Sequence, residues 1–287
     1  MRITALLENT TIDSTLEPKH GLSLYIETAK HKVLFDLGPD ETYMQNAQKM
    51  GINLAEVDTA VISHGHYDHG GGLAGFLSLN DNARIFLHRK AFEPHYHKVR
   101  FSKKYIGLDQ KIADSKRFTF VDDTMLIDDE LFLFSDIEGQ FDTKSHRALL
   151  KKTRDGYKRD DFTHELCLIA TEGDKSVLFS GCSHRGINNI LIAADKHSSA
   201  IRAVFGGFHL MNPTTKKSEP VEVVEKLAGE LSARNTEYYT CHCTGKSAFE
   251  TIHGIMGDIV RYLSTGEVVV ISSALDRARP EDRRQAD

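Results

Sequence analysis

The sequence has no apolar run long enough to cross a membrane and no excess of positive charge. Its longest apolar stretches fall well short of the ~20 residues that a membrane-spanning helix requires. At the start of the chain, Glu8 interrupts the apolar residues before a signal-like segment can form. The net charge of -5 and the isoelectric point near 6.3 argue against a protein that binds nucleic acid or membrane surfaces. We therefore expect a cytoplasmic protein that contacts neither.

Cysteine is also scarce, which bears on the redox chemistry of the chain. The cysteines are Cys167, Cys182, Cys241 and Cys243. One residue separates Cys241 from Cys243, which is poor geometry for a mutual disulfide. Because thiols stay reduced in the cytosol, the spacing favours free or metal-linked thiols over a disulfide framework.

Apolar residues make up 40% and charged residues 27% of the 287 residues, which allows a sizeable core. Short apolar runs that resemble strands come first and then alternate with helical patterns, which is typical of a layered α/β fold. We expect one domain over residues 1–275 and a charged tail over 276–287. A basic segment around 89–160 interrupts the pattern. It is either a solvated face or a lid that steers an anionic, phosphorylated substrate.

The strongest functional signal is a group of metal-binding side chains directly after the apolar run 57–62. His64, His66, Asp68 and His69 fall within six residues and are flanked by glycines. A strand would send alternate side chains to opposite faces, and a helix would spread them around its circumference. A strand that ends in a tight loop can instead gather all four in one pocket. Imidazole and carboxylate are ligands that suit Zn²⁺, Fe or Mn.

Further histidines and a cysteine recur where later strands are expected to end. They are Cys182 and His184 after 176–180, His209 after 200–205, and His242 after 238–240. Ligands from distant parts of a chain meet at one edge of a sheet in open α/β enzymes. We expect these side chains to join the first four.

The pattern His-x-His-x-Asp-His at residues 64–69 resembles the signature of the metallo-β-lactamase superfamily. This resemblance implies a four-layer αββα sandwich with two metal sites. It implies that His64 and His66 hold one metal, and that Asp68 and His69 hold a second. The remaining metal ligands that it implies are His164 for the first site, Cys182 in place of a bridging aspartate, and His242 for the second site.

The roles of Cys182 and Asp36 each allow two interpretations. Cys182 is either a thiolate ligand, which would favour Zn or Fe, or a small buried side chain beside which His184 turns inward. The resemblance places Asp36 below the metal centre, where it would orient a ligand. The alternative for Asp36 is an ordinary turn aspartate.

Several segments resemble one branch of the superfamily more closely. They are residues 8–10, 20–23, 63–69, 181–187, 206–210 and 241–245. The branch comprises the 7,8-dihydropterin-6-methyl-4-(β-D-ribofuranosyl)aminobenzene 5'-phosphate synthases, which are dihydropteroate synthase-like proteins. The resemblance implies a transferase-like activity in which the metal assists a leaving group on a pterin.

These observations favour a metal-dependent hydrolase-type enzyme with one or two zinc ions, Fe or Mn being alternatives. Its substrate would be a small anionic molecule, phosphorylated or pterin-like. We expect Asp68 to position a metal-activated water. His184 or His209 would donate a hydrogen bond or a proton, unless they are structural imidazoles. Two other classes compete: a non-catalytic metal-containing sensor and a thiol-linked redox enzyme.

Overall fold

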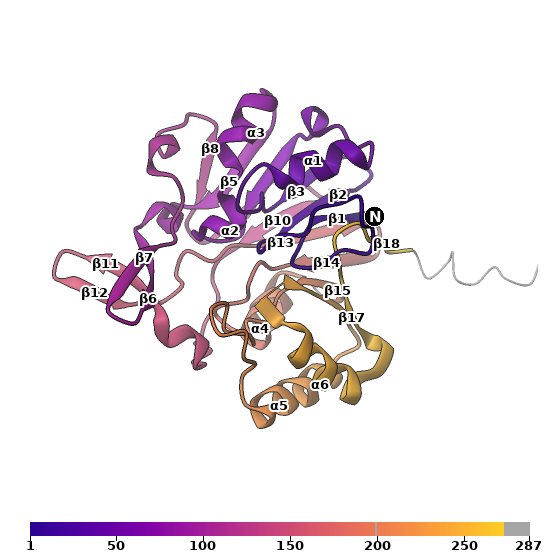
Figure 1. Ribbon diagram of the computed structural model, residues 1–287. Coiled ribbons are helices and arrows are strands. Elements are labelled where there is room, and N and C mark those ends of the chain that lie inside the picture. Colours follow the sequence, from indigo (N-terminus) through magenta and orange to yellow (C-terminus); the bar gives the residue numbers. More distant parts are fainter. Residues whose placement is uncertain (199, 273–287) are drawn as a thin grey trace, which may run out of the picture.

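The computed structural model describes residues 1–198 and 200–272. In this part of the chain two large β-sheets pack face to face, with helices on the outer face of each and a small third sheet at one side (Figure 1). This is the four-layer αββα arrangement that the sequence predicts. The predicted tail, residues 276–287, lies outside the described residues. No helix in the described ranges is long and apolar enough to cross a membrane.

The first large sheet contains most of the N-terminal half of the chain. Its strands are β1 (Arg2–Leu7), β2 (Ser23–Glu27), β3 (Lys32–Phe35), β4 (Thr59–Ile62), β5 (Arg84–His88), β8 (Phe118–Val121) and β18 (Val268–Val270). They follow the order β18-β1-β2-β3-β4-β5-β8. From β3 to β8 the neighbours are parallel. The carboxyl ends of β3, β4 and β5 therefore lie at the same edge.

The second large sheet is built mainly from the C-terminal half. Its strands are β9 (Thr124–Leu126), β10 (Leu131–Phe134), β13 (Cys167–Glu172), β14 (Lys175–Phe179), β15 (Ile201–Gly206), β16 (Glu237–Thr240) and β17 (Val260–Tyr262). They follow the order β17-β16-β15-β14-β13-β10-β9. Because β14, β15, β16 and β17 are parallel, the residues that follow β14, β15 and β16 also share one edge.

Helices cover the outer faces of both sheets. On the first sheet they are α1 (Thr42–Lys49) and α3 (Leu73–Leu79), and on the second α4 (Ile187–His197), α5 (Val221–Ser232) and α6 (Lys246–Met256). The short helix α2 (Tyr67–Gly70) lies in the loop that follows β4. Buried apolar side chains fill the space between the sheets, as where the Phe35 and Phe179 rings meet with centroids 5.9 Å apart. Two further apolar clusters join α1 and α3 to the first sheet and α4, α5 and α6 to the second. The apolar stripe of α5 faces the sheet, since Val224, Leu227 and Leu231 are buried.

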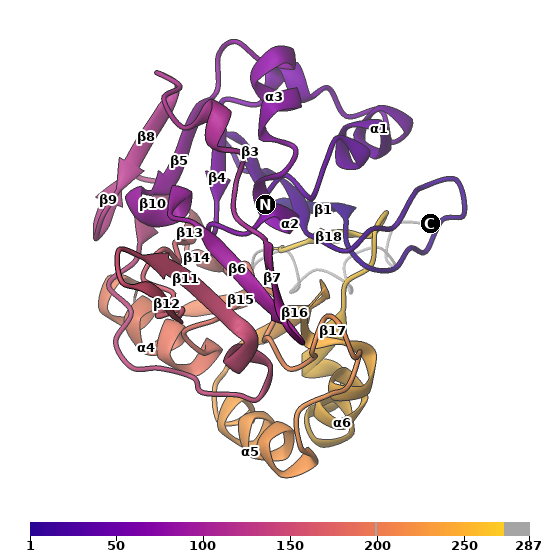
Figure 2. The same cartoon turned by 60° about the vertical axis from the view of Figure 1, so that its left-hand side comes forward.

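The basic segment around residues 89–160 contains a small antiparallel sheet. Its strands are β6 (His95–Val99), β7 (Ser102–Tyr105), β11 (Leu149–Thr153) and β12 (Gly156–Arg159), in the order β12-β11-β6-β7. Figure 2 shows these strands side by side, outside the two large sheets. The small sheet borders the edge at which the predicted metal ligands lie, as described below.

Candidate metal centre

The loop that carries most of the predicted ligands begins where β4 ends. After Ile62 the chain turns through residues 63–66 and enters the short helix α2. The turn is tight at Gly65, where a Cβ would lie 2.2 Å from the carbonyl oxygen of Ala91 and 2.9 Å from His95 Nε2. Only glycine fits there, so the loop holds His64 and His66 against the rest of the protein.

Asp36 lies beneath this loop, fully buried at the end of β3. Its Oδ1 accepts the Ser63 backbone N–H at 2.8 Å, and its Oδ2 accepts the Ser63 hydroxyl at 2.7 Å and His69 Nδ1–H at 2.6 Å. Asp36 therefore fixes both the loop and the orientation of His69, the role that the resemblance implies for it.

One group of buried imidazoles joins the loop to the second sheet. The candidate ligand atoms of His64, His66 and His184 lie within 4.8 Å of one another. All three Nε2 atoms are buried and have no hydrogen-bond partner among the described residues. Burial, reinforced by the neighbouring imidazoles, holds the pKa of each ring well below its usual range. Neutral imidazoles with unpartnered inward nitrogens are what a divalent metal requires.

His64 and His184 are each held through the nitrogen that faces away from the group. Ser63 Oγ hydrogen-bonds His64 Nδ1 at 2.9 Å, and His146 Nε2 lies 3.2 Å from His184 Nδ1. Ser183 adopts a positive φ of 54° directly before His184. This strained turn places His184 in the group, where sequence reasoning had proposed a catalytic role for it.

A second group surrounds the carboxylate of Asp68. The Nε2 atom of His242 lies 3.5 Å from Asp68 Oδ2, and the Nε2 atom of His69 lies 3.8 Å from it. Cys182 Sγ lies 3.2 Å from His69 Nε2, and the candidate ligand atoms of His64, His69 and Cys182 form a further close set. Cys182 thus touches both groups, as the position of a bridging ligand would demand.

The charges around His69 favour a cation. Burial would lower the pKa of His69, but the Asp36 and Asp68 carboxylates outweigh it and raise that pKa to about 9. The same surroundings that hold a proton on the ring would hold a metal ion there instead. Burial raises the pKa of the Cys182 thiol, and a bound metal would favour its thiolate form.

His242 is anchored by the start of the chain, at the end of β1. Asn9 Oδ1 accepts His242 Nδ1–H at 2.9 Å, and the Asn9 amide donates to the His242 carbonyl at 2.8 Å. Glu8 Oε2 accepts the His242 backbone N–H at 3.0 Å. These contacts leave His242 Nε2 free to face Asp68. Residues 8–10 belong to the segments that resemble the branch described above, and these hydrogen bonds show that Glu8 and Asn9 hold His242 in place.

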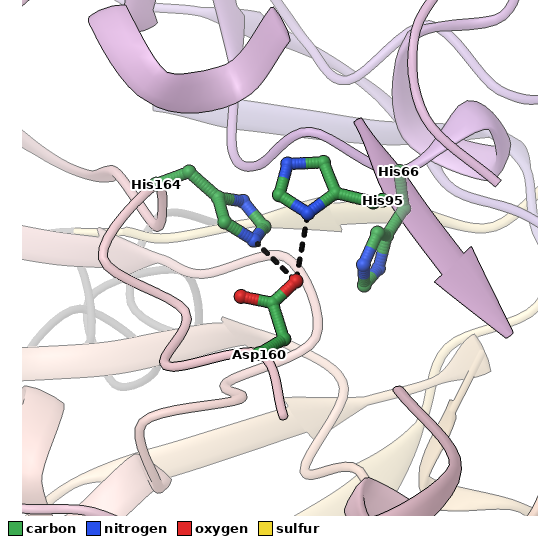
Figure 3. Close-up of side chains that lie close together, drawn as sticks. All are labelled: His66, His95, Asp160 and His164. Atoms are coloured by element: carbon green, nitrogen blue, oxygen red, sulfur yellow. Dashed lines mark hydrogen bonds and ion pairs between the residues drawn. The ribbon is translucent and has the colours of Figure 1, made fainter. Parts of the chain in front are cut away.

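His164 belongs to a further group of buried candidate ligands, which it forms with His66, His95 and Asp160 (Figure 3). His164 Nδ1 accepts the Gly65 backbone N–H at 2.9 Å, and its Nε2 lies 3.4 Å from Asp160 Oδ2. Asp160 Oδ2 also accepts His95 Nδ1–H at 2.7 Å. Burial lowers the pKa of His164 to about 4, with His95 adding to the effect. Neither His95 nor Asp160 could be found from the sequence, because their segment shows no regular pattern.

His209 lies after β15 with a positive φ of 48°. Both of its ring nitrogens are buried without a hydrogen-bond partner in the described residues. Its ring stacks on His146 at 4.3 Å, and its backbone N–H donates to Cys243 Sγ at 3.3 Å. His209 is therefore held rigidly beside His184 with uncommitted ring nitrogens, which suits donation to a substrate.

A cavity of about 240 Å³ opens onto these groups. His66, Asp68, His184, His209 and His242 line its inner part. The orphaned imidazole nitrogens and the mixed nitrogen, oxygen and sulfur donors fit one or two first-row divalent metals. The two groups around His184 and Asp68 contain the predicted ligands His64, His66, Asp68, His69, Cys182 and His242. The predicted ligand His164 instead shares the group of His66, His95 and Asp160.

Comparison with known proteins defines the class of this protein. The family model for the metallo-beta-lactamase superfamily matches residues 16–218. The chain belongs to this superfamily. A crystal structure of a metal-dependent hydrolase of the beta-lactamase superfamily matches with a TM-score of 0.75 and 28% sequence identity, covering 95% of this chain and 100% of that chain.

Two relatives from Methanocaldococcus jannaschii match almost the whole chain. One is an uncharacterized protein, 26% identical over 90% of this chain and 99% of its own length. The other is named 7,8-dihydropterin-6-methyl-4-(beta-D-ribofuranosyl)-aminobenzene-5'-phosphate synthase, 27% identical over 85% of this chain and 90% of its own length. The branch of the superfamily suggested by the sequence segments is therefore represented among the relatives.

Proposed function

We propose that this protein is a metal-dependent hydrolase-type enzyme that acts on a small anionic substrate. The observation that carries the proposal is the convergence of three buried, unpartnered Nε2 atoms, from His64, His66 and His184, at a cavity beside Asp68. One metal would be held by these imidazoles. A second would be held by Asp68, His69 and His242, with Cys182 between the two.

The donor set favours zinc, with Fe or Mn as alternatives. When bound, such ions supply a Lewis acid and activate water near pH 7. The residues of this chain provide the positioning. Asp68, whose pKa His69 and His242 hold well below its usual range against the effect of burial, stays ionised and positions the attacking water by accepting a hydrogen bond from it. His209 donates to the charge that develops on the leaving group.

The name of one relative supports the proposed substrate class. Phosphorylated and pterin-like molecules are favoured because the relative at 27% identity is named as a synthase of a dihydropterin ribofuranosyl-aminobenzene phosphate. A synthase-like transfer, in which a leaving group departs with metal assistance, is the second form of this proposal. The described cysteines are free thiols, which suits a reducing compartment, and we place the activity in the cytoplasm.

Metal analysis combined with a substrate screen tests this proposal. The purified protein would be analysed for bound metals and assayed with phosphomonoesters, phosphodiesters, lactones and pterin diphosphates. We expect His66→Ala to lose both metal and turnover. His253→Ala is the matched control, because His253 is a half-exposed histidine in the last turn of α6 whose Nε2 lies 3.8 Å from Asp258 Oδ1.

Three outcomes would contradict the proposal. Survival of metal and turnover in His66→Ala would remove the assigned centre. Tight binding of these compounds by the metal-loaded wild type without turnover would favour a sensor. Oxygen consumption that depends on added thiol would favour a redox enzyme, for which Cys182 and Cys243 lie close enough to cooperate.

A further inference from the structure

The small sheet presents a row of three side chains to the cavity. Leu149 of β11 pairs with His97 of β6, and His97 pairs with Lys104 of β7. Paired residues in adjacent strands point to the same face of a sheet. All three line the cavity that opens onto the metal ligands. Figure 2 shows the three strands β11, β6 and β7 side by side.

The two polar members of this row have no partner to occupy them. In the described residues Lys104 forms no ion pair, and its Nζ lies 5.7 Å from the centroid of the Tyr67 ring. His97 Nε2 is buried and has no hydrogen-bond partner in the part of the chain that the structure describes. A buried polar nitrogen without a partner is costly. An acceptor that enters the cavity would remove that cost.

The nearby side chains of Lys103 and Lys151 interact with other residues. Lys103, next in the chain, points to the opposite face, where its Nζ lies 4.5 Å from the centroid of the Tyr157 ring. Lys151 is nearly buried and pairs with Asp161 at 2.8 Å and with Glu93 at 3.5 Å. The basic character of the segment therefore reaches the cavity through Lys104.

We propose that His97 and Lys104 form a binding subsite for a second anionic group of the substrate, a phosphate monoester remote from the reacting bond. This inference rests on the proposed function, because the reacting end would lie at the metal ligands. A phosphate dianion offers several acceptor oxygens, and the Lys104 ammonium and one His97 N–H can meet two of them. Asp68 is the only carboxylate among the described cavity-lining residues, and it lies with the metal ligands.

The residues around His97 and Lys104 also indicate the chemical character of the rest of the substrate. Burial, and then the adjacent Lys104, lowers the pKa of His97, so His97 is a neutral donor and Lys104 supplies the charge. Val99, Ile106 and Leu149 line the same part of the cavity. The substrate is therefore bifunctional, with an apolar or aromatic body between its reacting group and a terminal phosphate.

Calorimetry of the zinc-loaded protein tests the subsite with a pair of nucleotides. Thymidine 5'-monophosphate carries one phosphate, and thymidine 3',5'-bisphosphate carries a second one at a distance. We expect the wild type to bind the bisphosphate more tightly by on the order of tenfold, the scale of one charge-assisted hydrogen bond. Lys104→Met should abolish this preference, and His97→Gln should reduce it.

Lys103→Met is the matched control, since it removes the same charge from the opposite face of β7 and should keep the preference. Equal affinity of the wild type for both nucleotides would overturn the inference. So would a preference that survives in Lys104→Met. Hydrolysis of bis(4-nitrophenyl) phosphate by the wild type reports separately on the proposed function. Its absence, with the bisphosphate preference intact, would refute catalysis and leave the subsite standing.

Discussion

Replacing Asp36 by asparagine tests how the buried carboxylate supports the metal centre. Asp36 accepts three hydrogen bonds, two from Ser63 and one from His69 Nδ1–H. In Asp36→Asn, an amide NH₂ in the place of Oδ2 would face the His69 Nδ1–H, so that two donors would meet. His69 could then keep its N–H only by losing that hydrogen bond, at a cost of about 1.5–3 kcal/mol. Otherwise it would move its proton to Nε2, the atom that faces Cys182.

Either response weakens the second metal position. Loss of such a supporting partner lowers metal affinity by roughly 10- to 100-fold, or about 1.4–2.8 kcal/mol. A competitive zinc titration against a chromophoric chelator measures this change, and thermal unfolding in chelator shows whether the metal-free fold survives.

Asp58→Asn provides the matched control. Asp58 also pairs with a histidine, with 2.8 Å between His31 Nδ1 and its Oδ1, and accepts a backbone N–H from Lys32 at 2.7 Å. It lies at the opposite end of β4 from the metal loop. We expect unchanged zinc affinity in this variant. Zinc affinity in Asp36→Asn within twofold of the wild type would refute the reasoning.

Other perturbations follow from the same structure. Elemental analysis should show that His184→Ala loses one metal equivalent per chain and that His164→Gln keeps the full complement; the opposite result would exchange their roles. Gly181→Ala would place a Cβ 2.0 Å from a serine hydroxyl of the metal loop and should cost about 3 kcal/mol in chemical denaturation. Gly229→Ala, with open space around it in α5, should instead gain about 0.5–1 kcal/mol. Burial opposes ionisation of Asp161, but its lysine partner lowers the pKa of Asp161 to about 2. The ionised Asp161 side chain therefore stabilises the fold above pH ~3.8, and this contribution is lost as the pH falls towards 2. Asp161→Asn should therefore be less stable than the wild type by about 1 kcal/mol at pH 5, after allowance for solvent screening, and the difference should shrink at pH 3.

The sequence by itself determined the fold class and the metal loop. Residues 64–69 are so close together in the chain that any strand-to-helix turn brings them near one another. His209 and His242 were also predictable in position, because β15 and β16 are parallel and their carboxyl ends share an edge. Asp36 was identified through the family resemblance, and the pairing of β3 with β4 explains why it lies beside the metal loop.

The tertiary structure decided which distant histidine joins His64 and His66. The family resemblance implies His164 for the first site, and His184 is the alternative. In the structure the positive φ at Ser183 turns His184 towards His64 and His66. His164 Nδ1 accepts the Gly65 N–H, and the ring groups with His66, His95 and Asp160 instead.

The small sheet could not be predicted from the sequence. Its strands are short, and the direction in which their side chains point depends on register. A shift of one residue exchanges the two faces. The pairing of His97 with Lys104, and with it the face of the sheet that meets the cavity, is set by contacts between segments that are far apart in the chain.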